Sequence, residues 1–350
     1  MGDGQARLPR SRGGAGRPAP KPAQSPQGVA RWPDARHYAA LDLGTNNCRL
    51  LIARPQGGGF AVVDAFSRIV RLGEGLATTG RLSDAAIDRT LAALRICAEK
   101  LKRRNVALAR SVATEACRQA TNGTAFIERV YAETGIALDI ITAEEEARLA
   151  VLGCHALLEP GDGPALVFDI GGGSTELVLV DSRAANPRIL DWHSAPWGVV
   201  SLTEAAGIAD GAAGGQAVYA EMRRRVSESF APFVTRLQAP KGTPRLLGTS
   251  GTVTTLASVH LGLSSYDRSV VDGLIVPAAS MRSVSRRIAE MSMADRAQVP
   301  CIGSERADLV VAGCAILETI MDFWPAERLG IADRGIREGI LRRLMSGGTL

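Results

Sequence analysis

The chain has no apolar stretch approaching the length that crosses a membrane, and its six cysteines stand singly, without Cys-x-x-Cys pairs or histidines at metal-ligand spacing. These absences argue against a membrane partner, a disulfide scaffold and a zinc site. Reduced thiols favour the cytoplasm. The Gly-x-x-x-x-Gly-Lys-[Ser/Thr] loop and a nucleophile elbow are also missing, and the four histidines form no triad. The usual P-loop and serine-type mechanisms are therefore not expected.

With 350 residues, of which 46% are hydrophobic, the chain can bury one or two sizeable cores. Residues 1–36 differ from the rest, because they are rich in Gly, Pro, Ala and Arg and poor in large apolar residues, which predicts disorder. Their seven Lys or Arg and two Asp account for the whole net charge of +5. A basic tail can bind an anionic polymer or act as a transit peptide, but a solvated extension is the simpler interpretation, and we expect no nucleic-acid partner.

One pattern occurs twice: an apolar run, an acidic residue, a turn of glycine with small hydroxyl or amide residues, and a second apolar run. The copies are Asp42–Leu50 and Asp169–Leu177. Each predicts a β-hairpin. A single copy would be an ordinary hairpin turn. Two copies whose aspartates lie 127 positions apart indicate a duplicated domain.

Both turns have the composition of a phosphate cradle, because glycine accepts positive φ and lets an anion approach the backbone N–H groups. Arg49 interrupts an apolar strand, and a charge there needs a partner or a ligand. A carboxylate beside phosphate is repulsive unless a hard cation lies between them, so Asp42 and Asp169 are candidate ligands of Mg²⁺ or Mn²⁺. The candidate phosphate-binding residues of the two turns are Gly44, Thr45, Asn46, Arg49, Gly171, Gly172, Gly173, Ser174 and Thr175.

Strands and helices alternate along the rest of the chain, which predicts an α/β fold with ligands at the C-terminal ends of strands. Strands are expected near 60–66, 109–113 and 138–141, and helices after the caps Ser83, Thr114 and Thr142. The inward face of a long helix is predicted at Met222, Val226, Phe230 and Val234. The apolar segment 310–323 predicts a buried core helix, with a dimer contact as the alternative.

The segment 246–252 again ends a strand and opens a helix, where amides and the helix dipole favour an anion. This adds Gly248, Ser250 and Gly251 to the candidate phosphate-binding residues.

Hydrolysis of a phosphoanhydride needs an oriented water and cations on the phosphoryl oxygens. Glu144, Glu145 and Glu146 point in directions about 100° apart, so only one or two of them can face a cleft. Without other signals, three acids in a first turn simply complement the helix dipole. Arg118 follows a strand-to-helix turn and could clamp a phosphoryl group, although a lone helix arginine is usually a surface residue.

Residues 41–50, 167–179 and 246–254 resemble the two phosphate motifs and the adenosine-type motif of the actin, sugar kinase and Hsp70 superfamily. Within it, residues 112–122, 142–148 and 169–176 resemble the signatures of the exopolyphosphatase and guanosine pentaphosphate phosphatase (Ppx/GppA) family. The likeness runs from about Tyr38 to Leu341. It implies two ribonuclease-H-like (actin-like ATPase) α/β domains, residues 37–150 and 151–332, with an active-site cleft between them. The C-terminal helix, 333–350, would pack back on the first domain.

The resemblance implies metal-dependent release of terminal phosphate from inorganic polyphosphate, with guanosine pentaphosphate as the alternative substrate. By position, Glu146 matches the catalytic base that orients the attacking water, and Arg118 the arginine that holds the phosphoryl group. Glu176 matches a second acidic residue near the water and the metal, and Asp169 the metal carboxylate. Arg49 and Arg306 occupy places where the family binds substrate phosphates.

Two features bear on the substrate. Thr45 and Asn47 stand where the family more often has serine. The chain also stops soon after the second domain, so we expect it to lack the helical HD-type domain of longer members and to prefer short polyphosphate or the guanosine nucleotide. A homodimer is possible from the resemblance.

Two other classes of function compete with the hydrolase. An ATP-dependent kinase or ATPase of the superfamily would need an adenosine pocket, and a non-enzymatic alarmone binder would not need Glu146. Glu146 and Arg118 together favour the hydrolase.

Overall fold

The computed structural model describes residues 1–2, 36–182, 187–207, 215–237 and 244–347. The predicted basic tail, residues 1–36, lies almost wholly outside the described residues, as does most of the Gly- and Ala-rich segment that follows Gly207. The chain from Pro33 onwards forms one compact unit. None of the described helices is long and apolar enough to cross a membrane.

The first sheet has five strands in the order β3-β2-β1-β4-β5. Strands β1, β2 and β3 form an antiparallel meander, and β4 and β5 run parallel to β1. Both faces of β1 are covered, which explains why its sequence is a continuous apolar run. The strands are β1 (His37–Leu43), β2 (Asn47–Gln56), β3 (Gly59–Ile69), β4 (Val106–Ala113) and β5 (Leu138–Ile140).

The second sheet has six strands in the order β10-β11-β9-β6-β7-β8. Its β8-β7-β6-β9 part repeats the β3-β2-β1-β4 part of the first sheet, including the parallel pairing of β6 with β9, as a duplicated unit requires. The strands are β6 (Pro164–Ile170), β7 (Thr175–Asp181), β8 (Arg188–Ala195), β9 (Arg245–Thr249), β10 (Ile275–Pro277) and β11 (Arg328–Ala332).

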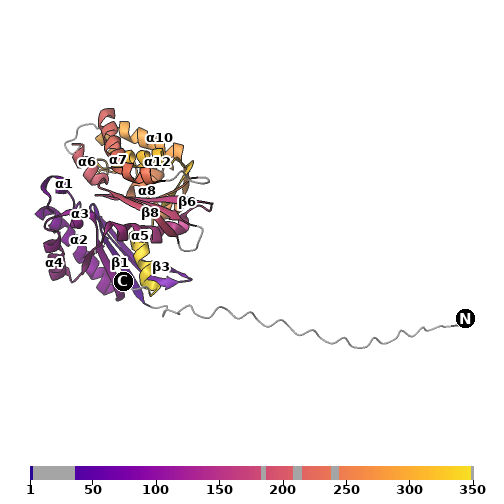
Figure 1. The fold of residues 1–350 in the computed structure, drawn as a ribbon. Helices are drawn as coiled ribbons and strands as arrows, with labels where there is room; N and C mark the ends of the chain where they lie inside the picture. The colour runs from indigo at the N-terminus through magenta and orange to yellow at the C-terminus, as the bar shows by residue number, and fades with distance from the viewer. Residues whose placement is uncertain (3–35, 183–186, 208–214, 238–243, 348–350) are drawn as a thin grey trace. The chain divides into compact units, whose positions relative to one another are not determined.

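Helices cover both sheets (Figure 1). The first sheet carries α2 (Asp84–Arg103) and α4 (Gly123–Thr134) against one face, and α5 (Ala143–Cys154) and α13 (Ile336–Met345) against the other. The second sheet carries α6 (Val199–Ala205), α7 (Gln216–Arg236), α8 (Gly251–His260), α10 (Ala278–Glu290) and α12 (Val310–Phe323). The short helices are α1 (Leu76–Thr79), α3 (Glu115–Gln119), α9 (Arg268–Val271), α11 (Met293–Gln298) and a 3₁₀ turn, His155–Leu157.

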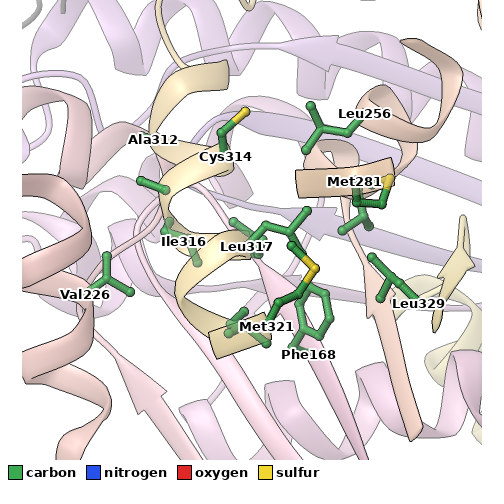
Figure 2. Close-up of a cluster of buried hydrophobic side chains, with 14 of the residues drawn as sticks. Phe168, Val226, Leu256, Met281, Ala312, Cys314, Ile316, Leu317, Met321 and Leu329 are labelled. Carbon is green, nitrogen blue, oxygen red and sulfur yellow. The ribbon is translucent and has the colours of Figure 1, made fainter. Parts of the chain in front are cut away.

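Helix α12 lies at the centre of the second core, and its residues 310–321 are all buried. This helix is therefore core, and it is not available as the dimer contact that the sequence left open. Figure 2 shows Ala312, Cys314, Ile316, Leu317 and Met321 of α12 with Phe168 of β6 and Leu329 of β11.

Two details differ from the sequence predictions. Thr142 caps α5 through its side chain, but Thr114 makes no such bond at the start of the five-residue α3. In α7 the inward residue after Phe230 is Phe233, whereas Val234 is 36% exposed. The difference follows from helix geometry. Phe233, 11 positions after Met222, lies about three full turns along the helix and faces the same way, whereas Val234 is rotated from Met222 by about 120°.

Helices α5 and α13 touch backbone to backbone. A Cβ at Gly153 of α5 would overlap the carbonyl oxygen of Gly335, and one at Gly339 of α13 would overlap the carbonyl oxygen of Leu149. Glycine is required at both positions because any side chain would hold the helices apart. Figure 1 shows α13 beside β1 and α5, although it is the last helix of the chain.

Candidate active site

One cavity gathers the ends of strands from both sheets. The turn after β1, the turn after β6, the start of α8 and the segment after β11 all line it. These are C-terminal strand ends, where open α/β sheets collect ligands. The predicted site residues that line the cavity are Asp42, Gly44, Thr45, Asn46, Arg49, Glu146, Asp169, Gly171, Gly172, Gly173, Ser174, Ser250, Gly251 and Arg306.

Four predicted site residues do not line this cavity. Two of them, Thr175 and Gly248, were predicted to bind phosphate but make other contacts. The Thr175 hydroxyl donates to the Trp197 carbonyl at 2.6 Å and is fully buried, so it is not available to phosphate. Gly248 packs against the ring of Phe168, where a Cβ would lie 2.5 Å from it, so this glycine serves core packing. Glu176 and Arg118 lie behind the cavity wall.

The two phosphate turns face each other across the cavity and have the same internal bond. The Gly44 amide donates to the Asn47 carbonyl at 2.9 Å, and the Gly171 amide donates to the Ser174 carbonyl at 2.9 Å. A Cβ at Gly172 would lie 2.9 Å from the Thr45 Cβ, so a side chain there would push the turns apart. Absent side chains leave backbone amides available to an anion.

Helix α5 presents only one of its three first-turn glutamates to the cavity. Glu144 pairs with Arg148 at 2.7 Å, and Glu145 pairs with Arg110 at 2.8 Å. Glu146 is 7% exposed and lines the cavity. The 100° helical step thus separates two ion-paired surface residues from one buried carboxylate.

Arg118, which does not line the cavity, binds the carboxylate of Glu146. Its two Nη atoms each lie 3.2 Å from Glu146 Oε2, Nη1 donates to the Ile141 carbonyl at 2.7 Å, and Nε donates to Glu115 at 2.9 Å. Burial lowers the pKa of Arg118, but the Glu146 and Glu115 charges more than offset it. In this arrangement Arg118 positions the Glu146 carboxylate, and its contact with a phosphoryl group stays a prediction.

The carboxylates Asp169 and Glu146 of the cavity, and Glu176 beside it, are in surroundings that resist their ionisation. Burial, then repulsion from Asp42, raises the pKa of Asp169 to about 6, and burial, then repulsion from Asp169, raises that of Glu176 to about 7. Burial raises the pKa of Glu146 well above its usual value, with Glu176 adding to the effect. Glu176 is 1% exposed, and its Oε1 accepts from Ser174 at 2.7 Å and from Ser194 at 2.9 Å.

The donor set fits a hard divalent cation. Asp42 Oδ1 is buried without a hydrogen-bond partner, and Asp169 is the neighbouring carboxylate. Within the described ranges there is no cluster of three or more His, Cys, Asp or Glu that could hold a metal by themselves. Mg²⁺ suits such a site, because it binds through one or two carboxylates and takes its other ligands from water and substrate phosphates.

The raised pKa of Asp169 predicts that metal-free protein loses stability as pH rises. The folded state keeps the Asp169 proton to about pH 6, whereas the unfolded state releases it near the ordinary pKa of 3.8. Ionised Asp169 therefore costs about 3 kcal/mol above pH 6 and nothing below pH 3. In urea unfolding experiments, the free energy of unfolding of Asp169→Asn should rise relative to that of wild type between about pH 4 and 6. A pH-independent difference would contradict this, and Mg²⁺ at pH 8 should stabilise only wild type.

The sequence reasoning missed the segment after β11. Asp333, Arg334, Gly335, Ile336 and Arg337 all line the cavity. The signal was present, because β11 runs parallel to β9, so its polar end reaches the same edge of the sheet as Thr249.

A duplicated unit whose two turns face one cavity defines an α/β protein of the actin-like class. The sequence model of the Ppx/GppA phosphatase family matches residues 51–347, and the chain belongs to this family. It is 33% identical to "Exopolyphosphatase 2" of Mycobacterium tuberculosis, with 86% of this chain and 96% of that protein covered. It is 30% identical to the "Guanosine-5'-triphosphate,3'-diphosphate pyrophosphatase" of Aeromonas salmonicida, with 88% of this chain covered, and it spans 59% of that relative's length.

A solved structure agrees with these relatives. The crystal structure of the Aquifex aeolicus Ppx/GppA family member has a TM-score of 0.73 at 27% identity, covering 90% of this chain and 99% of that one. The predicted family and the predicted actin-like α/β fold are confirmed. Both curated relatives carry names of phosphoanhydride hydrolases, and membership of their family makes this chain an enzyme of that kind, as predicted.

Proposed function

We propose that the protein hydrolyses the terminal phosphoanhydride bond of inorganic polyphosphate and releases orthophosphate. The observation that carries this proposal is the placement of Glu146, a buried carboxylate facing the space between two glycine-rich phosphate turns. Such a space suits a phosphoryl group, and a carboxylate at its edge suits a water molecule that attacks it. We place the activity in the cytoplasm, since all six cysteines are unbridged.

In the proposed mechanism Glu146 orients the attacking water and takes up its proton. Its raised pKa makes it a stronger base than an ordinary glutamate once it is ionised, and Arg118 fixes the rotamer of the carboxylate. The amides of Thr45, Asn46, Gly172 and Gly173, which are not used in the internal bonds of the turns, donate to the phosphoryl oxygens. Asp42 and Asp169 would hold Mg²⁺ or Mn²⁺, which supplies positive charge to the phosphate oxygens when bound.

Polyphosphate is favoured over guanosine pentaphosphate by the lining of the cavity. No Phe, Tyr or Trp is among the described residues that line it, so no aromatic ring is available there to stack on a base. The lining includes six glycines, seven threonines or serines, five carboxylates and four arginines. Guanosine pentaphosphate remains the second candidate, because the Aeromonas salmonicida relative carries the name of such an enzyme.

Phosphate release from tripolyphosphate, long polyphosphate, guanosine pentaphosphate and ATP, each with Mg²⁺, tests the proposal. We expect the two polyphosphates to be cleaved fastest, and EDTA to stop release. Turnover of the guanosine nucleotide alone would move the function to the alternative. Release from ATP alone would indicate an ATPase and contradict the proposal.

A further inference from the structure

Two cavity arginines have no partner within the part of the chain that the structure describes. Arg49 of β2 and Arg337 of α13 make neither a hydrogen bond nor an ion pair to a described residue, although both line the cavity. The other two cavity arginines are engaged. Arg306 donates to the Thr255 hydroxyl at 2.8 Å, and Arg334 pairs with Asp272 at 2.7 Å.

Arg337 has no partner because the acidic residues beside it are already bound. Glu338 accepts from the Gly335 amide at 2.9 Å and from Arg268 at 3.0 Å, and Asp333 pairs with Arg268 at 3.2 Å. Burial lowers the pKa of Arg337, so its guanidinium is desolvated as well as unpaired. Desolvated charges in proteins are paired or bind a ligand.

Asp42 is an unsatisfied acid of the same cavity: burial raises its pKa, and the nearby charges of Arg49 and Arg337 offset only part of that rise. Its Oδ1 is nevertheless buried without a hydrogen bond. Opposite charges that face one space without touching leave room for a ligand that satisfies both. A metal-bound phosphate does so, since its oxygens bind arginine and its cation binds the carboxylate.

Arg49 and Arg337 are distinct from Arg118, the arginine that contacts Glu146. Arg118 contacts Glu146 directly, whereas the Arg49 guanidinium lies 3.4 Å from the Cβ position of Gly251, where α8 begins. Arg306 binds Thr255, one helical turn further along α8. Arginine side chains are thus present both at the start of α8 and one turn further along it.

We propose that Arg337 is a specificity-determining residue which, with Arg49, binds the phosphate on the leaving side of the scissile bond. The inference rests on the proposed function and deepens it, because it makes a second linked phosphate a requirement for tight binding. In this assignment a single phosphate held between the turns does not engage the arginine pair, whereas pyrophosphate and longer chains do.

Calorimetric titration separates this inference from the proposed function. The measurements use Glu146→Gln protein, which binds without turnover, and titrate orthophosphate, pyrophosphate and tripolyphosphate with Mg²⁺. Adding Arg337→Gln should weaken the affinity for pyrophosphate and tripolyphosphate about 10- to 100-fold, as expected for lost charge-assisted hydrogen bonds. The affinity for orthophosphate should fall by no more than about threefold. Arg342→Gln, on the same helix but outside the cavity lining, is the matched control and should change nothing.

Equal weakening of all three anions would place Arg337 on the terminal phosphate, and no weakening would remove it from the site; either result overturns the inference. Arg337→Lys keeps the charge but not the planar fork and should recover part of the affinity, which also guards against a misfolded glutamine variant. If no anion binds even the Glu146→Gln parent, the proposed function itself fails.

Discussion

Replacing Glu146 by glutamine is expected to lower kcat for phosphate release by about 10²- to 10⁴-fold, the usual contribution of a general base. The amide keeps the size of the side chain and can still contact Arg118, but it cannot accept a proton. Substrate affinity should change little, since the phosphate turns and the cavity arginines are untouched. Steady-state phosphate release with tripolyphosphate, compared with calorimetric affinity, measures the two effects separately.

Glu145→Gln is the matched control, because Glu145 is the preceding residue of the same helix and pairs with Arg110 away from the cavity. Its kcat should remain within about twofold of wild type, since this partly buried ion pair lies outside the cavity lining. Glu146→Gln should also unfold at a temperature no lower than wild type, because burial disfavours the charge that it removes. Full activity of Glu146→Gln would rule out this residue as the base.

Gly153→Ala is expected to destabilise the fold by about 3 kcal/mol or more, at the upper end of what overpacking costs. The added methyl group would overlap the Gly335 carbonyl, and a backbone atom cannot move aside as a side chain does. Helices α5 and α13 would have to separate, and they carry Glu146 and Arg337 respectively. Urea unfolding should show the loss of stability, and kcat should fall in the protein that remains folded.

Gly215→Ala is the control for this substitution. Gly215 precedes α7 with φ of −64°, and a Cβ there meets nothing within 4 Å. Its unfolding free energy should differ from wild type by about 1 kcal/mol or less, because the weaker N-cap is partly offset by the lower entropy of the unfolded chain. If Gly153→Ala were as stable as Gly215→Ala, the close contact of α5 and α13 would not be a constraint on the fold.

The repeated turns made the fold predictable from sequence. Hydrophobic runs around Asp42 and Asp169 predicted the hairpins, and the parallel strands that follow predicted which ends meet at a ligand site. Among the three glutamates of α5, the 100° step predicted that only one or two face the cavity. Which one does so depends on where α5 packs, and the residues alone left that open; only the family resemblance pointed to Glu146.

Other residues could not be placed because their surroundings come from distant parts of the chain. Arg337 looks like an ordinary helix arginine, and its lack of a partner is visible only once Arg268 is seen to occupy Glu338 and Asp333. Gly248 matched a phosphate motif, yet the ring that requires it belongs to Phe168 of another strand. In the same way, the Thr175 hydroxyl was predicted to bind phosphate but donates to the carbonyl of Trp197.

The position of α13 determines when the first sheet can be completed during synthesis. Tyr38, Ala40 and Leu51 face a cluster whose other side includes Ile340 and Leu341, nearly 300 residues later in the chain. Contacts of such long sequence separation form late, because the intervening chain must first be made and ordered. Because a nascent chain emerges from its N-terminal end, one apolar face of the first sheet lacks α13, the second of its two helices, until then. The segment that brings Arg337 to the cavity thus also completes the helical cover of the first sheet, so the site is assembled only once this late packing is finished.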